Sequence, residues 1–150
     1  MTTPTTPNTP SPRSVGEVAR RTGLSVHALR YYEREGLMLA PISRAPGGQR
    51  EYTANDVKWL LICVRLRESG MPLAELKRFA ALVREGPGNE PERLALLEAQ
   101  RDRIDAQIHA LEASRSVIEW KVDIYARRLR EGSAEGFWSP VPPAHERVSE

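Results

Sequence analysis

Cysteine is almost absent from this sequence, since Cys63 is its only example among 150 residues. A single thiol cannot form an intrachain disulfide and is too few for a cysteine-based metal cage within one chain. Residues that could catalyse a reaction are also scattered: Cys63 and the three histidines stand on separate predicted elements. The sequence shows no glycine-rich phosphate loop and no cluster of residues with the spacing of metal ligands. We therefore expect neither an enzyme nor a bound metal or cofactor.

Long apolar runs are missing as well. No membrane-length segment and no signal peptide is visible, so we expect a cytoplasmic protein without a membrane partner. Charge of one sign is not in large excess either, and the formal net charge of +2 does not by itself indicate a nucleic-acid partner. Basic residues are, however, crowded into the first third of the chain, while many acidic residues lie further on. This basic set consists of Arg20, Arg21, Arg30, Arg34, Arg44, Arg50 and Lys58.

The two ends of the chain differ in composition from the middle. Residues 1–13 are mostly Thr, Pro, Ser and Asn, and they have too little apolar surface to offset the entropy of an ordered chain. We expect them to form a disordered tail. Residues 132–150 are rich in Pro and Gly but carry Phe137 and Trp138. This second tail is expected to be either mobile or docked through its two aromatic rings.

The most informative stretch begins at Ser14 and predicts two short helices joined by a tight turn. Ser14 is a good N-cap residue, and Glu17 three positions later fits a capping box. Gly23 stands where a turn between helices needs a residue that tolerates positive φ. Ser25 then caps a second helix, on which Leu29 and Tyr32 supply the buried face. This order is typical of a helix-turn-helix, which places its second helix in the major groove of DNA.

A small wing and two further helices follow this pair. The loop over 39–51 contains two prolines and the pair Gly47-Gly48, which break helices and permit a tight hairpin. Thr53, with Asp56 at the capping-box position, starts a third helix that is apolar on most sides. Pro72 fits the first turn of a fourth helix, which Gly86 and the residues after it end. Residues 14–86 are thus predicted to form a winged helix-turn-helix DNA-binding domain with two additional helices.

The last helix, over 89–131, carries a sustained heptad repeat of apolar residues. A lone helix of this kind leaves its apolar stripe in water, and the chain offers no second long helix to cover it. We therefore expect a second copy of the chain as the partner, with a helix that folds back on its own domain as the alternative. The residues expected in the dimer interface are Leu97, Ile104, Ile108, Leu111, Ile118 and Val122.

Several runs of residues together resemble a known family. They are Arg30-Tyr31-Tyr32-Glu33, then Gly36-Leu37, the loop Gly48-Gln49-Arg50-Glu51-Tyr52, and the run from Leu66 to Leu73. This combination is similar to the MerR family of bacterial transcription regulators. The resemblance implies a mainly α fold: a winged helix-turn-helix head followed by a long C-terminal dimerisation helix that forms an antiparallel coiled coil. It also implies a homodimer that bends and untwists a promoter spacer, and so acts on RNA polymerase indirectly.

By position, the resemblance implies a set of contacts with double-stranded promoter DNA. The second helix supplies base or phosphate contacts, the wing holds the backbone, and the start of the third helix adds a phosphate contact. The expected DNA-binding residues are Val26, His27, Arg30, Tyr31, Arg44, Arg50, Tyr52 and Lys58. Tyr32 is expected in the core. Gln49 departs from the family, which often has a larger or aromatic residue there.

The signal that the protein senses is less constrained. The family's metal sensors carry cysteines beside the dimer helix, and this chain has none there. A short subgroup of the family responds to aldehydes, electrophiles or nitrosative stress through a lone cysteine, and Cys63 is the corresponding sensor candidate. Arg65 or Arg67 would then favour its thiolate. An inert buried Cys63, an apolar inducer and a winged-helix protein-interaction module (a co-chaperone modulator or recombination factor) remain the alternatives.

Overall fold

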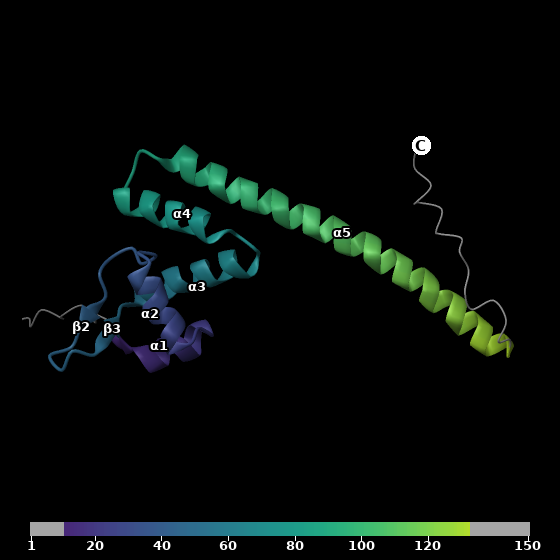
Figure 1. The fold of residues 1–150 in the computed structure, drawn as a ribbon, viewed down its shortest axis with the longest axis horizontal. Helices are drawn as coiled ribbons and strands as arrows, with labels where there is room; N and C mark the ends of the chain where they lie inside the picture. Colours follow the sequence, from purple (N-terminus) through teal and green to yellow (C-terminus); the bar gives the residue numbers. More distant parts are fainter. Residues whose placement is uncertain (1–10, 133–150) are drawn as a thin grey trace, which may run out of the picture. The chain divides into compact units, whose positions relative to one another are not determined.

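The computed structural model describes residues 11–132 and divides the chain into two units at Arg101. We call residues 11–101 the head and residues 102–131 the distal helix. The head contains four helices, a three-stranded sheet and the first part of the fifth helix, while the distal helix is the remainder of that fifth helix (Figure 1). The fold is mainly α, with a helix-turn-helix in the head and a long C-terminal helix, as predicted.

The helix-turn-helix consists of α1 (Val15–Thr22) and α2 (Val26–Arg34). The side chains of Ser14 and Ser25 cap the two helices by accepting backbone N–H groups, and Gly23 turns the chain with a φ of 74°. The prediction of a full capping box at α1 is wrong, because the Glu17 carboxylate binds Arg13 at 2.9 Å instead of the Ser14 backbone. Both caps and the turn glycine nevertheless form where the sequence predicts them.

The wing is a small antiparallel sheet of strand order β1-β3-β2. Its hairpin is formed by β2 (Ser43–Arg44) and β3 (Arg50–Tyr52), and β1 (Arg13–Ser14) pairs with the other edge of β3. The hairpin is predicted by the sequence, but β1 is not. Arg13, expected at the end of a disordered tail, pairs in the structure with Tyr52.

The core of the head forms where α3 (Ala54–Glu68) packs beside α1, the sheet and α4 (Leu73–Glu85). Thr53 caps α3 with the predicted capping box, in which Thr53 and Asp56 bond each other's backbone N–H. The Trp59 indole stacks on Phe79 and donates a hydrogen bond of 2.7 Å to the Leu37 carbonyl. The buried Trp N–H is therefore satisfied, and it ties α3 to the loop after α2.

Two cations of α4 hold the end of α2. Lys77 forms an ion pair with Glu35, which lies directly after α2. Arg84 donates to the carbonyls of Gly36, at 2.5 Å, and Met38, at 2.9 Å. The carbonyls of the last turn of α2 accept from backbone N–H groups that follow the helix. Arg84 therefore holds the loop after α2 and joins that loop to α4.

The last helix, α5 (Glu90–Glu131), begins within the head. Arg78 of α4 binds Glu92 through two nitrogens, and Gln100, which is almost fully buried, donates to both oxygens of Ser69. The helix bounds agree within one residue with the predicted range 89–131. Among the described residues, no helix is both long and apolar enough to cross a membrane.

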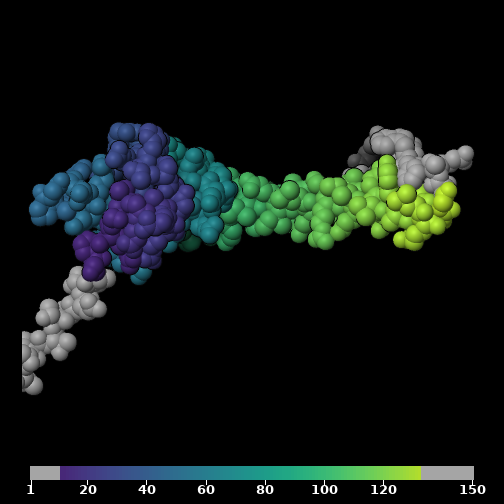
Figure 2. All heavy atoms as spheres, turned by 90° about the horizontal axis from the view of Figure 1, so that it is seen from below, coloured from purple at the N-terminus to yellow at the C-terminus, as the bar shows by residue number. Residues whose placement is uncertain are grey.

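The distal helix exposes most of its large apolar side chains. Leu111 is 69% exposed and Ile118 is 62% exposed; Figure 2 draws the atoms of this helix in green to yellow. Val122 and Ile108 are exposed as well, while Ile104 is half-buried. Each predicted dimer residue therefore retains surface that a partner could cover. The predicted docking of Phe137 and Trp138 concerns residues that lie outside the described range.

Candidate nucleic-acid interface

The outward face of α2 carries residues suited to reading DNA. Leu29 and Tyr32 are buried in the core, so the residues between them point away from it. Arg30 and His27 are exposed, and Val26 is half-buried at the first position of the helix. The helix thus presents a guanidinium, an imidazole and a small apolar group on its outer face, which are suited to base edges and phosphates.

Tyr31 lies at the side of this face and is half-buried. Its ring meets Tyr32 edge to face at a centroid distance of 6.5 Å, and the Arg34 guanidinium lies 5.6 Å from the Tyr31 ring centroid. These contacts fix the orientation of the phenol relative to α2.

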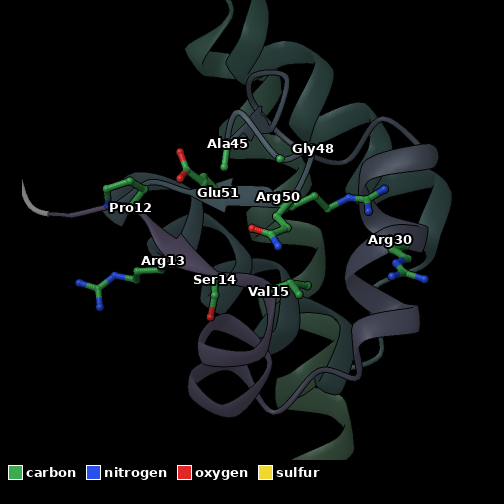
Figure 3. A pocket seen from close by; sticks show the side chains of 11 residues that line it. Pro12, Arg13, Ser14, Val15, Arg30, Ala45, Gly48, Arg50 and Glu51 are labelled. Atoms are coloured by element: carbon green, nitrogen blue, oxygen red, sulfur yellow. The ribbon is translucent and has the colours of Figure 1, made fainter.

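An open groove of about 620 Å³ lies between α2, the wing and the start of the described chain (Figure 3). Arg30 contributes from α2 and Arg50 from β3, while the hairpin turn supplies Gly47, Gly48 and Gln49. Figure 3 shows the Arg50 side chain reaching from the strand towards α2. Two arginines and an exposed glycine-rich backbone are thus brought together at one concave surface, which is an arrangement suited to phosphate.

A single carboxylate joins the wing to α2. Glu33 of α2 accepts a hydrogen bond of 2.5 Å from Nε of Arg50, and its other oxygen lies 3.6 Å from Nη2 of Arg44. Arg44 also donates to the Gly48 carbonyl at the tip of the hairpin. The Arg50 side chain is only 23% exposed, whereas that of Arg44 is 48% exposed. Arg50 is therefore held closely and Arg44 more loosely.

Of the predicted DNA-binding residues, Arg30 and Arg50 line this groove, while Val26, His27, Tyr31, Arg44, Tyr52 and Lys58 do not. Lys58 is exposed on the second turn of α3 and does not line the groove. Tyr52 is only 1% exposed and belongs to the core, which corrects its place among the predicted contacts. Burial raises the pKa of the Tyr52 phenol, and its hydroxyl makes no hydrogen bond within the described structure. The Tyr52 side chain packs in the hydrophobic core of the head.

Arg13 is a residue of the groove that the sequence does not indicate. It lines the groove from β1 and forms an ion pair with Glu17 of α1. β1 has only two residues, so it has no periodicity that a sequence pattern could reveal. The basic side chain of Arg13 was the one signal in the sequence that could have pointed to this residue.

Cys63 lies on α3 and is completely buried. Burial raises the pKa of its thiol to about 12, opposed by a backbone hydrogen bond. Arg67 donates instead to the Met71 carbonyl, and Arg65 pairs with Glu68. The predicted support of the thiolate by Arg65 or Arg67 is therefore wrong for this conformation. Within residues 11–132, no three His, Cys, Asp or Glu side chains are grouped to hold a metal ion.

Comparisons with known protein families agree with this geometry. The family described as "MerR HTH family regulatory protein" matches residues 13–82, which cover the helix-turn-helix, the wing, α3 and most of α4. The family described as "MerR, DNA binding" matches residues 57–120, from α3 into the distal helix. Together the two matches span most of the described chain.

One known relative matches nearly the whole length, and another matches about three fifths of it. An uncharacterised HTH-type transcriptional regulator of Haemophilus influenzae is 32% identical over 87% of this chain and 96% of its own. The HTH-type transcriptional regulator AdhR of Bacillus subtilis is 33% identical over 61% of this chain and 64% of its own.

A solved structure resembles the fold as a whole. It is that of HiNmlR, a MerR family regulator lacking the sensor domain, bound to promoter DNA. It superposes with a TM-score of 0.77 and 31% identity, and covers 88% of this chain and 99% of its own.

Proposed function

This chain belongs to the MerR family of DNA-binding transcriptional regulators, and from that membership we propose that it acts as a homodimer whose two heads bind one promoter and distort the spacer DNA between them. The observation that carries the proposal is the exposed apolar stripe of the distal helix. Leu111, Ile118 and Val122 lie on it at helical spacing, and each is more than half exposed. A stripe of this length in water favours association with a second amphipathic helix.

The second helix is best supplied by another copy of this chain. A coiled coil of two identical distal helices covers both stripes at once, and closes the assembly with two-fold symmetry. We propose the antiparallel arrangement, in which the heads lie at opposite ends of the paired helices. Arg115, which stands four residues after Leu111 and three before Ile118 and so falls on the same stripe, pairs with Glu119 of its own helix at 2.8 Å. The Arg115 guanidinium is therefore paired within its own helix, so the proposed coiled coil does not have to bury an unpaired charge between its two helices.

Each head would place α2 in the major groove and the wing on the adjacent backbone. Arg30 and His27 are exposed on α2 for base edges or phosphates, and Arg44 and Arg50 extend from the wing. Lys58 adds a phosphate contact from the start of α3. Support comes from the similar structure of HiNmlR, which is bound to promoter DNA. The contacts of the wing position the duplex, while those of α2 carry more of the sequence information.

Distortion of the spacer follows from binding two half-sites with one dimer. Bending a short duplex costs roughly 1–6 kcal/mol, and contacts of both heads with the backbone would offset that cost. Specificity then depends partly on how easily the spacer deforms, beyond the bases that α2 touches. We propose that RNA polymerase responds to this altered spacer, without direct contact with the regulator.

The direct test combines footprinting with sedimentation. Purified protein should protect two half-sites in the DNA upstream of its own gene, and it should sediment as a dimer at micromolar concentration. Circularly permuted fragments of that DNA should show position-dependent mobility in gels, which reports bending. A monomer at micromolar concentration, or protection of one half-site without any change of mobility, would contradict the proposal.

A response to electrophiles through Cys63 would have to proceed through an opened form of the head. The thiolate is the reactive species, and burial disfavours it in the closed core. Alkylation would then push an added group into the packing between α3 and its neighbours. The test compares induction by formaldehyde or methylglyoxal in the wild type and in Cys63→Ala, with unchanged DNA binding as the control. Full induction in the variant would rule out Cys63 as the sensor.

A further inference from the structure

We infer that Glu33 is a positioning residue for DNA binding: its carboxylate orients Arg50 so that the remaining N–H groups of this guanidinium meet a phosphate. The inference rests on the proposed function, because it takes the groove between α2 and the wing as the DNA-binding surface. It concerns an acidic residue on a surface that binds an anion, where a negative charge is unexpected.

The geometry places Glu33 as the link between two elements that must act together. Its carboxylate belongs to α2, while Arg50 belongs to β3, seventeen residues later in the chain. The bond of 2.5 Å uses only Nε of Arg50. A guanidinium has five N–H donors in a rigid plane, so the Nη groups can still donate to a phosphate while Nε is held.

Burial supports a positioning role over a simple surface ion pair. The side chains of Glu33 and Arg50 are each about three-quarters covered, whereas exposed pairs move freely and contribute little. An arginine held in this way loses less rotamer entropy when it binds its target. The second oxygen of Glu33 faces Arg44 at 3.6 Å, so the same carboxylate also restrains the other strand of the hairpin.

Two effects of removing Glu33 oppose each other, and this makes the inference testable. Removing a negative charge beside phosphates should by itself strengthen DNA binding. Removing the support of Arg50 should weaken it. We expect the second effect to dominate, because Arg50 would have to be ordered at the moment of binding.

The experiment measures the affinity of the full-length protein for its own upstream DNA as a function of salt. Glu33→Ala should weaken binding roughly fivefold, and the slope of log affinity against log salt should fall by about one, as expected for a lost phosphate contact. Glu33→Gln, which keeps an acceptor oxygen for Nε, should weaken binding less. Glu51→Ala is the matched control, since Glu51 lines the same groove from the same strand as Arg50, and its removal should strengthen binding.

A double-mutant cycle with Arg50→Ala separates the inference from the proposed function. In the Arg50→Ala background, Glu33→Ala should no longer weaken binding. Circular dichroism and sedimentation of each variant check that it folds as the wild type does. If Glu33→Ala does not fold, Glu33→Gln replaces it in the double-mutant cycle.

Three results would overturn these claims in distinguishable ways. If Arg50→Ala leaves affinity unchanged, the wing contact of the proposed function is wrong, and the inference falls with it. If Arg50→Ala weakens binding but Glu33→Ala strengthens it as Glu51→Ala does, only the inference is wrong. Equal weakening by Glu33→Ala with and without Arg50 would also overturn the inference, because Glu33 would then act through another group.

Discussion

The head and the distal helix are stabilised in different ways. The head encloses a core of its own, in which Leu60, Leu76 and Ala80 are completely buried, and its α1, α2 and α3 helices begin with side-chain caps. The distal helix leaves most of its large apolar side chains exposed. Packing within one chain is thus enough to explain the fold of the head, whereas the sequence of the distal helix is explained best by a partner.

This difference separates two kinds of hydrophobic residue that look alike in the sequence. Leucines of the head gain their stabilisation when the chain folds, while leucines of the distal helix would gain theirs when two chains associate. Substitutions in the two regions should therefore respond differently to protein concentration. The first and third of the following four predictions test that contrast, and the other two examine the head through its pH dependence.

The largest effect should come from the same truncation made in each region. Leu60→Ala should lower the free energy of unfolding by about 2–5 kcal/mol at every protein concentration, because it leaves a cavity in the core of the head. Leu111→Ala should instead raise the dissociation constant of the dimer. Urea titrations followed by circular dichroism measure the free energy of unfolding of each variant. Repeating them over a hundredfold range of protein concentration separates the loss in the head from the weaker dimer. Equal and concentration-independent losses would remove the distinction between the two regions.

Cys63 gives the second prediction, which concerns alkaline pH. Below the ordinary pKa of a thiol, about 9, both folded and unfolded chains keep the proton, so the group contributes nothing to the pH dependence. Above it, the unfolded chain releases the proton while the folded core, with a pKa of about 12, retains it. Stability should therefore fall as pH rises, by roughly 1 kcal/mol per pH unit from this group. Cys63→Ala should show a shallower decline in the same urea titrations.

The third prediction tests the cap of α3. Thr53→Ala removes the acceptor for the Asp56 backbone N–H, a bond of 3.1 Å, and should destabilise the head by about 1 kcal/mol. Thr53→Ser keeps the hydroxyl and serves as the matched control. Because α3 lies in the head, the loss measured in thermal unfolding should not depend on protein concentration. A loss of stability that disappears on dilution would instead show that α3 is stabilised by formation of the dimer.

The smallest effect should come from the ion pair between Lys77 and Glu35. The hydrogen bond from Lys77 lowers the pKa of Glu35 below its ordinary value of 4.5. A carboxyl whose pKa is lower in the folded state contributes stability above its ordinary pKa, and loses it as the pH falls through the folded value. Glu35→Gln should therefore flatten the acid limb of the stability curve slightly. An acid limb identical to that of the wild type would show that the pair does not form in solution.

Local sequence signals predict the backbone of this protein well. Ser25, Thr53 and Gly23 have chemical roles that depend on only a few neighbouring residues, and each acts where it was expected. The long helix has the predicted bounds because its heptad repeat is sustained and glycines interrupt the chain before it.

Contacts between distant residues are what the sequence does not reveal. The bond between Glu33 and Arg50 depends on how the hairpin returns to α2, and the burial of Cys63 depends on which side of an apolar helix meets the core. The resemblance placed Tyr52 among the DNA contacts, but its side chain is buried in the core of the head, which depends on how β3 packs beside α3. Such features are fixed by tertiary packing, which a single sequence does not show.

The bonds from Arg84 to the carbonyls of Gly36 and Met38 have a consequence for how the head is made. These bonds join residues 48 and 46 positions apart. During synthesis, α2 leaves the ribosome before α4 does, so the Gly36 and Met38 carbonyls in the loop after α2 stay hydrated until Arg84 has emerged. The nascent chain thus fixes the loop behind the second helix of its helix-turn-helix only after α4 has emerged.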